Sequence, residues 1–232
     1  MKLWGRLLVL ALAAVLCTSV LPTSVLPAFA TDPAPSVEVH ANKTVYVTGQ
    51  TAVLSFKISN AGQNTHLKVV AVYANGASKV YNDTDVYSDS VPDEQVYMYF
   101  DTRIDVYVAG STTPDATLKL PVQAAVGSAI GSYYTRSGSY AVFPKGYQPA
   151  FRSATVPAHA GRCLRHEVWR QYASGWKPIL LSSCKAEDSQ GSVTWTWVGT
   201  HGSGVNFRVR AKFLGDRLNH ANAGRFIYFR FK

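Results

Sequence analysis

Basic side chains alternate with apolar ones in two segments near the end of the 232-residue sequence. Residues 207–213 read Phe-Arg-Val-Arg-Ala-Lys-Phe, and residues 227–232 read Ile-Tyr-Phe-Arg-Phe-Lys. Because alternate side chains of a β-strand point to opposite faces, the polar members of each segment are expected on one face, about 7 Å apart. These polar members are Arg208, Arg210, Lys212, Tyr228, Arg230 and Lys232.

If the two segments pair as neighbouring strands, as they would in an immunoglobulin-like order, the cations and the tyrosine share one sheet face. Such a face attracts the phosphates of cell-wall polymers, acidic glycans or nucleic acid, with an affinity that falls steeply as salt is added. The alternative is a basic surface that only keeps the protein soluble and discourages edge pairing. The sequence therefore predicts a candidate polyanion-binding face and leaves its ligand unknown.

The basic residues are concentrated in the second half of the chain. Residues 31–134 hold six basic and ten acidic side chains, a net charge of −4, whereas residues 135–232 hold fifteen and four, a net charge of +11. The overall charge of +9 therefore combines an acidic segment with a strongly basic one. This polarity also allows head-to-tail self-association, in which the acidic half of one molecule meets the basic half of another.

Two of the three cysteines have the spacing of a disulfide. Cys17 lies in the expected export signal, which leaves Cys163 and Cys184 for an oxidising compartment. A turn at residues 172–175 lies midway between them, so both sulfurs are expected at the same end of two antiparallel strands, close enough to bond. The hairpin so closed supports an alternative function, in which a secreted inhibitor or effector presents residues 172–176 to a protein target.

Residues 82–94 form an acidic segment that is expected to be a loop. Its carboxylates occupy positions 1, 3, 7 and 12 of a calcium-binding loop and belong to Asp83, Asp85, Asp89 and Glu94. Position 6, where the sharp turn of such a loop requires glycine, is Ser88. A solvated acidic loop is the favoured interpretation, and calcium binding is left open.

Motifs for catalysis are incomplete. His166 and Glu167 begin a zinc-protease string, but Arg170 stands where its second histidine belongs, and the surrounding residues alternate like a strand. Residues 201–204 read His-Gly-Ser-Gly and are expected to form a turn between strands, not the strand-to-helix turn of a serine hydrolase. No catalytic residue, metal site or cofactor is therefore predicted, and a hydrolase would require a deep polar pocket with two close carboxylates.

The elements that position these residues are expected to be short β-strands. Period-two alternation recurs from residue 36 onward, with turn residues every eight to twelve positions, and no amphipathic helix of useful length appears. In the first half, Leu54, Phe56 and Ile58 are expected to face the core. Trp169, Trp176, Trp195 and Trp197 are expected mainly as core or inter-sheet filling.

Composition and the first thirty residues indicate a secreted protein. The chain is 47% hydrophobic and 16% charged, too apolar for disorder. Lys2 and Arg6, an apolar run at 7–16 and the sequence Ala-Phe-Ala at 28–30 are typical of a signal peptide cleaved after residue 30. No later stretch is long and apolar enough for a membrane span, so the mature protein is expected outside the cell.

Short motifs recur in both halves of the chain. In the first half the motif is residues 44–51, Thr-Val-Tyr-Val-Thr-Gly-Gln-Thr. In the second half the motifs are residues 175–176, 191–197, 199–201, 207–210 and 215–216. These motifs resemble the tandem bacterial immunoglobulin-like repeats of secreted actinobacterial proteins, and the resemblance implies an extracellular interaction or spacer protein without known chemistry.

The expected fold is all-β: two tandem immunoglobulin-like antiparallel β-sandwiches after the signal peptide. The first is expected at residues 31–134 and the second, which contains the disulfide, at 135–232. A cluster of glycine and serine at 127–138 places the boundary near residue 134.

Overall fold

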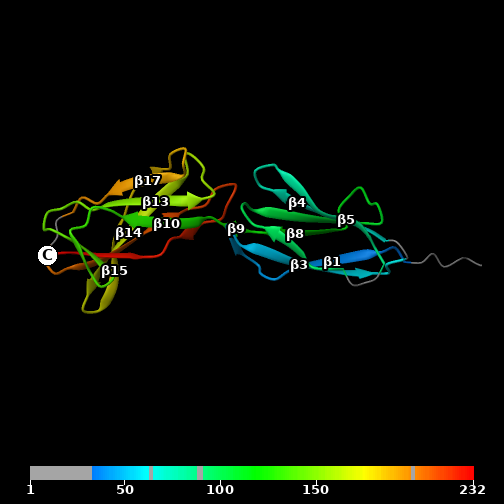
Figure 1. The fold of residues 1–232 in the computed structure, drawn as a ribbon, viewed down its shortest axis with the longest axis horizontal. Helices are drawn as coiled ribbons and strands as arrows, with labels where there is room; N and C mark the ends of the chain where they lie inside the picture. The colour runs from blue at the N-terminus through cyan, green and yellow to red at the C-terminus, as the bar shows by residue number, and fades with distance from the viewer. Residues whose placement is uncertain (1–32, 63–64, 88–90, 200–201) are drawn as a thin grey trace, which may run out of the picture. The chain divides into compact units, whose positions relative to one another are not determined.

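The computed structural model describes residues 33–62, 65–87, 91–199 and 202–232, of which Pro33–Lys232 form one compact unit. The described residues form strands and loops without a helix, and most strand pairs are antiparallel (Figure 1). The predicted all-β fold of β-sandwiches is therefore confirmed. The predicted signal peptide lies outside the described residues. Within them, no helix is long and apolar enough to cross a membrane.

The N-terminal sandwich consists of two sheets, with strand orders β1-β3-β6 and β5-β4-β7-β8. Its strands are β1 (Ser36–Ala41), β2 (Tyr46–Val47), β3 (Thr51–Ser59), β4 (Thr65–Tyr73), β5 (Ser78–Val86), β6 (Glu94–Tyr97), β7 (Thr102–Val108), β8 (Ala116–Leu120) and β9 (Val122–Gln123). The short strands β2 and β9 pair in parallel.

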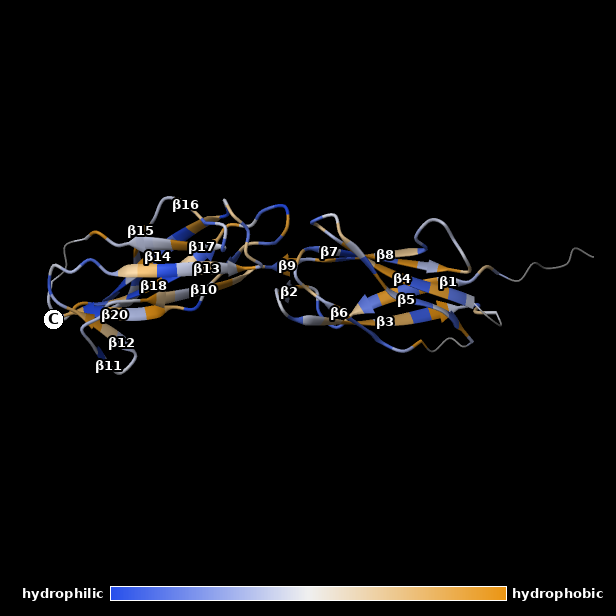
Figure 2. Cartoon of the chain, turned by 45° about the horizontal axis from the view of Figure 1, so that its top comes forward, coloured by the Kyte–Doolittle hydropathy of each residue, from blue (hydrophilic) through white to orange (hydrophobic). Residues whose placement is uncertain are grey.

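Alternation along the strands builds the core of this sandwich. Leu54, Phe56 and Ile58 of β3 are buried, as predicted, and pack in one cluster with inward side chains of β4 and β7. Figure 2 shows the corresponding bands of hydrophobic and hydrophilic residues along β3. Each such strand has one face in the core and one toward solvent.

The C-terminal sandwich has a smaller sheet, with the order β10-β13-β17, and a larger one, with the order β11-β12-β20-β18-β14-β15. Its strands are β10 (Ala125–Ile130), β11 (Thr135–Ser137), β12 (Tyr140–Phe143), β13 (Ala150–Val156), β14 (Cys163–Tyr172), β15 (Gly175–Leu181), β16 (Lys185–Ala186), β17 (Ser192–Thr196), β18 (Asn206–Phe213), β19 (Asn222–Ala223) and β20 (Ile227–Phe231). The boundary expected near residue 134 stays a prediction; β10, which precedes it, pairs with β13.

Aromatic rings fill the core between these two sheets. Phe207 of β18 lies with its ring centroid 5.4 Å from that of Phe229 and 6.0 Å from that of Phe231, both on β20. The ring of Trp197 packs against the ring of Phe229 at 5.3 Å, and Trp195 is buried in the same cluster. Two of the four tryptophans of the second half are thus core residues, as expected.

The segment between β18 and β19 is hydrogen-bonded to the end of the N-terminal sandwich. The side-chain amide of Asn219 donates to the carbonyl oxygens of Tyr99 (2.9 Å) and Val122 (3.3 Å). The backbone N–H of Asp101 donates to the carbonyl of Leu218 at 2.8 Å. Because Asn219 is fully buried, these bonds are shielded from competing water.

The side chain of Arg162 holds this segment in place. It is 1% exposed, and its guanidinium donates to Asp216 Oδ2 (2.9 Å), to Asn219 Oδ1 (2.7 Å) and to the carbonyl of Pro157 (2.8 Å). A buried guanidinium is stable only when its donors are paired in this way. Arg162 therefore orients the amide that bonds to the N-terminal sandwich.

Replacing Arg162 with methionine should lower the free energy of unfolding by about 3–5 kcal/mol, because it leaves buried partners of the guanidinium unpaired. Urea denaturation measures the change. Arg217, which follows Asp216 in the sequence and is exposed, provides the matched control. Arg217→Met removes the same charge from the surface and leaves no buried group unpaired. Equal effects of the two substitutions would show that the buried network adds no stability.

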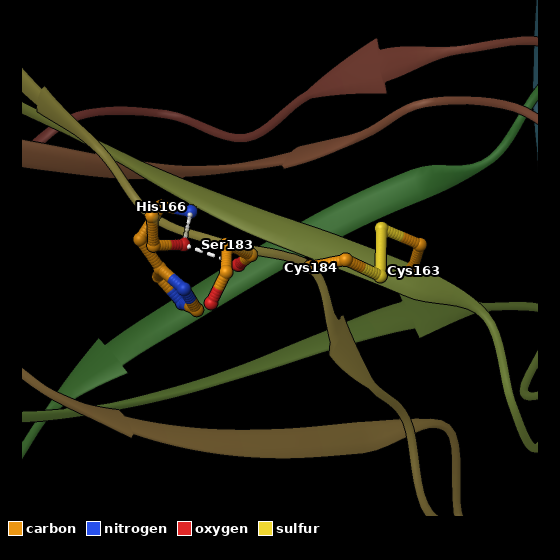
Figure 3. Close-up of a disulfide and its surroundings, with 5 residues drawn as sticks. Cys163, His166, Ser183 and Cys184 are labelled. Carbon is orange, nitrogen blue, oxygen red and sulfur yellow. Dashed lines mark hydrogen bonds between the residues drawn. A yellow bond between two sulfur atoms is a disulfide. The ribbon is translucent and has the colours of Figure 1, made fainter.

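The predicted disulfide between Cys163 and Cys184 is confirmed, with a Cα–Cα separation of 5.3 Å. As expected, β14 and β15 form a hairpin whose turn follows Tyr172. Figure 3 shows Ser183, directly before Cys184, beside His166 of β14. The hydroxyl of Ser182 accepts a hydrogen bond from the backbone N–H of His166 and donates to the carbonyl of Ser183 (both 2.9 Å), which fixes the return of the chain to β14.

A double substitution of Cys163 and Cys184 by alanine should lower the free energy of unfolding by about 3 kcal/mol, the chain-entropy value for a loop of roughly this length. Urea denaturation of the oxidised wild type, the reduced wild type and the variant measures the effect. The reduced wild type and the variant should agree with each other. Three coincident curves would contradict a stabilising role for the bond.

Candidate functional site

The larger sheet of the C-terminal sandwich carries the predicted basic residues on its outer face. In the antiparallel pair β18–β20, Arg208 lies opposite Tyr228 and Asn206 lies opposite Arg230. Directly opposite residues of neighbouring strands point to the same face, and Phe207, Val209 and Phe229 occupy the other, buried face. The expected pairing of the two basic segments is thus present, and Lys232 lies one position beyond the end of β20.

Arg208 lies at the centre of this face, among aromatic rings. Its guanidinium carbon is 4.0 Å from the ring centroid of Phe226, 4.8 Å from that of Trp176 and 4.9 Å from that of Trp169. A guanidinium held over aromatic rings is attracted to their electron-rich faces, and the attraction grows when the cation is partly desolvated. The three rings therefore hold the half-buried Arg208 in place.

Two other predicted cations are paired with a carboxylate. Arg210 Nε donates to Glu167 Oε2 at 2.8 Å, and Lys212 Nζ donates to Glu167 Oε1 at 3.0 Å. Burial alone would raise the pKa of Glu167, but the hydrogen bonds from Lys212 and Arg210 hold this pKa below its ordinary value. Arg210 and Lys212 thus share one negative charge, which reduces what they offer to a ligand.

The remaining cations of the set lie beside tyrosines. The guanidinium carbon of Arg230 is 5.8 Å from the ring centroid of Tyr140, and Lys232 Nζ is 3.8 Å from that of Tyr134. The ring of Tyr228 lies edge-on between Tyr140 (5.6 Å) and Trp176 (5.9 Å). Cations and aromatic rings therefore lie side by side across five neighbouring strands, β12, β20, β18, β14 and β15.

Several members of this face were not expected there. Trp169 and Trp176 lie on the outer face, which corrects their expected place in the core; Trp169 pairs across β14 and β18 with Arg208. Glu167 and Arg165, on the same face of β14, lie opposite Arg210 and Lys212. The alternation of residues 164–169 could have predicted these positions, because Leu, His and Val are buried there and Arg, Glu and Trp are not. We name the outer-face residues Arg165, Glu167, Trp169, Trp176, Asn206, Arg208, Arg210, Lys212, Phe226, Tyr228, Arg230 and Lys232 the cation–aromatic face.

The tip of the disulfide-closed hairpin is exposed, but one of its two aromatic side chains is engaged. Trp176 packs against Arg208 and Tyr228 of the sheet. Tyr172 is 40% exposed, and its ring lies 5.0 Å from the guanidinium carbon of Arg170. Trp176 therefore belongs to the cation–aromatic face, whereas Tyr172 stays accessible at the tip.

The acidic segment near residue 82 is largely a strand, not the expected loop. Asp83 and Asp85 belong to β5, where their carboxylates bond to Nε2 and Nδ1 of His66 at 2.7 and 2.9 Å. Glu94 accepts a hydrogen bond from the amide of Asn82 at 2.7 Å. Asp89 lies outside the described residues. These carboxylates have protein partners, and no group of three or more His, Cys, Asp or Glu side chains in the described chain is arranged to hold a metal ion.

A polar chain of side chains crosses the core of the C-terminal sandwich. His166 Nε2 is 2.9 Å from Ser153 Oγ, which is 2.9 Å from Ser128 Oγ. The imidazole stacks on the indole of Trp195, with centroids 4.8 Å apart. His166 and Ser153 are fully buried, whereas Ser128 is half-buried on β10.

The hydrolase alternative requires a pocket with two close carboxylates, and a hollow of about 530 Å³ lies near His220. It is lined mainly by apolar side chains such as Val72 and Leu120, and its one carboxylate is Asp101. The carboxylate Oδ1 of Asp101 accepts a hydrogen bond from the backbone N–H of Val122 at 2.7 Å. A second, close carboxylate, which paired-carboxylate hydrolysis needs, is not among the residues that line this hollow.

Comparison with known proteins gives no assignment. No family model and no curated protein matches the sequence. A tetra-tandem repeat in the extending region of a large adhesion protein is similar at 13% identity and a TM-score of 0.43, covering 86% of this chain and 50% of that one. A DUF4785 family protein from Legionella pneumophila is similar at 11% identity and a TM-score of 0.38, covering 80% and 54%.

Red sea bream transglutaminase is also similar, at 10% identity and a TM-score of 0.32, over 85% of this chain and 31% of that one. The chain thus spans about half, or less, of the solved structures it matches. Values this low decide neither the family nor the activity, and membership in actinobacterial immunoglobulin-like repeats stays a prediction.

The buried histidine predicts a pH dependence of stability. Burial lowers the pKa of His166 from 6.5 to about 4, so between these values the unfolded chain binds a proton that the folded protein excludes. Folding stability should therefore fall by up to about 3 kcal/mol as the pH drops through this window. Urea denaturation across the window measures the loss, and His166→Gln should remove it.

The exposed His159 provides the control for this titration. His159→Gln should leave the pH dependence of the unfolding free energy unchanged relative to the wild type. Parallel curves for the wild type and His166→Gln would show that the buried imidazole does not cause the acid sensitivity.

Proposed function

We propose that this protein is a non-enzymatic extracellular module that binds polyanions through the cation–aromatic face of its C-terminal sandwich. One observation carries the proposal: the register of β18 against β20 and β14 places Arg208, Arg230 and Arg165 on a single sheet face. The N-terminal sandwich serves as a spacer whose junction with the C-terminal one is held by the buried Arg162 network.

The balance of charges on this face favours binding over mere solubility. Six cations share it with a single carboxylate, that of Glu167, which bonds to only two of them. A purely solvated basic surface needs no aromatic rings to fix its cations. Here three rings surround one guanidinium, which reduces the side-chain entropy that a ligand contact would otherwise remove.

Secretion is part of the proposal. The disulfide between Cys163 and Cys184 is typical of a protein that folds in an oxidising compartment. The predicted signal peptide at residues 1–30 supports the same location. An extracellular position would expose the cation–aromatic face to cell-wall polymers and acidic glycans.

The hairpin alternative is less well supported. A protein that presents residues 172–176 to a target needs their aromatic side chains to be available. Trp176 is instead engaged with Arg208 and Tyr228. The polyanion-binding face therefore remains the better proposal.

Charge reversal tests the proposal. The triple variant Arg208→Glu, Arg230→Glu, Lys232→Glu should weaken binding to polygalacturonate and to polyphosphate by about 100-fold or more at about 50 mM salt, because the contacts are mainly electrostatic. Titrations followed by tryptophan fluorescence measure the affinities. The wild type should also lose affinity as salt is raised.

A triple variant of the N-terminal sandwich is the matched control: Lys43→Glu, Lys57→Glu and Lys119→Glu change the net charge equally at exposed positions. This control should keep most of the affinity. If both triple variants lose affinity alike, the overall charge and not the cation–aromatic face is responsible. If the wild type binds neither polymer at low salt, the proposed function is wrong.

A further inference from the structure

Arg208, like Arg165 on the same face, has hydrogen-bond donors to spare. Its guanidinium carries five N–H donors, yet no hydrogen bond or ion pair joins it to another residue in the described part of the chain. Nε is itself buried and unpartnered. Arg210 and Lys212, by contrast, donate to Glu167. A group that is fixed by stacking but lacks hydrogen bonds is prepared for an acceptor from outside.

Other polar atoms around Arg208 also lack partners among the described residues. They are the indole N–H of Trp169, which is a donor, and Oδ1 of Asn206, which is an acceptor. Trp169 lies directly opposite Arg208, and Asn206 is two positions before it on the same face of β18. A buried donor and a buried acceptor without partners thus occupy register positions next to Arg208 on the same face of the sheet.

We propose that this area is a site for a carboxylate-bearing sugar of an acidic polysaccharide, with Arg208 as its anchor; the inference rests on the proposed polyanion-binding function. The guanidinium fork matches the two oxygens of a carboxylate, and two parallel hydrogen bonds give both affinity and orientation. Sulfate esters of a glycan offer similar oxygens, so the two kinds of acidic group are compared in the test.

The mixture of donors and acceptors favours a glycan over a nucleic acid. Sugar hydroxyls can donate to Asn206 Oδ1 and to the carboxylate of Glu167, whereas phosphodiester oxygens only accept hydrogen bonds. The aromatic rings of Tyr228 and Trp176 add apolar surface against which the C–H groups of a sugar can pack.

The test replaces the bidentate guanidinium of Arg208 with the single ammonium group of lysine. Arg208→Lys keeps the positive charge but removes the bidentate geometry and the planar stacking on the rings. It should weaken polygalacturonate binding by about 10-fold or more, the value of one strong charge-assisted hydrogen bond. Arg217→Lys, the matched control at an exposed arginine outside the cation–aromatic face, should change the affinity by less than about 3-fold.

Four probes separate the possible ligands: polygalacturonate, dextran sulfate, polyphosphate and a single-stranded oligothymidylate. We expect the wild type to bind polygalacturonate most tightly, and Arg208→Lys to affect it more than polyphosphate. Tighter binding of dextran sulfate with the same sensitivity to Arg208→Lys would reassign the anionic group from carboxylate to sulfate and overturn that part of the inference. Tighter binding of the oligothymidylate would overturn the assignment of a glycan as the ligand.

A second variant removes only the indole donor. Trp169→Phe retains an aromatic ring beside Arg208 and should weaken polygalacturonate binding by about 3-fold or more while leaving polyphosphate binding unchanged. Thermal unfolding verifies that each variant is folded. If Arg208→Lys weakens binding no more than Arg217→Lys does, the site is not at Arg208, although the proposed function stands. If no polyanion binds the wild type, the function itself fails.

Discussion

The packing of Phe207 against Phe229 and Phe231 fixes the register of β18 and β20, and the rest of the C-terminal sandwich depends on that register. Since side chains alternate between the two faces of a strand, a shift by one residue would turn Arg208 into the core and a phenylalanine into solvent. Burial of the aromatic rings opposes such a shift strongly. The position of every cation on the outer face is thus a consequence of the apolar packing on the inner face.

The outer face shows how one sheet can hold many cations without losing stability. Glu167 is shared by Arg210 and Lys212, and aromatic rings surround Arg208. Pairing relieves the repulsion among the cations, whereas stacking leaves the N–H groups of the stacked cation without protein acceptors. The two devices give neighbouring arginines different properties, although both belong to the same alternating segment.

Buried polar side chains in the C-terminal sandwich have different consequences for stability. Arg162 has three hydrogen-bonded acceptors, so its burial stabilises the segment that bonds to Tyr99 and Val122. Glu187 accepts a hydrogen bond from Thr155 at 2.7 Å, but its Oε1 has no partner among the described residues, and burial raises its pKa. Because this pKa is raised, protonation of Glu187 favours the folded state at low pH, whereas protonation of the buried His166 opposes folding.

The sequence by itself determined the all-β fold, the disulfide and the outward direction of the cations of β18 and β20, because alternation and turn spacing are local properties of the chain. The strand at Asp83 and the outer-face positions of Trp169 and Trp176 were not predicted, because an acidic or aromatic side chain can occupy a loop, a core or a surface. Only the tertiary structure decided that Arg210 meets both Glu167 and the ring of Phe226, whereas Arg208 meets aromatic rings without a carboxylate. Those contacts depend on the register between β14, β15 and β18, and register is set by packing across the whole sandwich, which no single segment encodes.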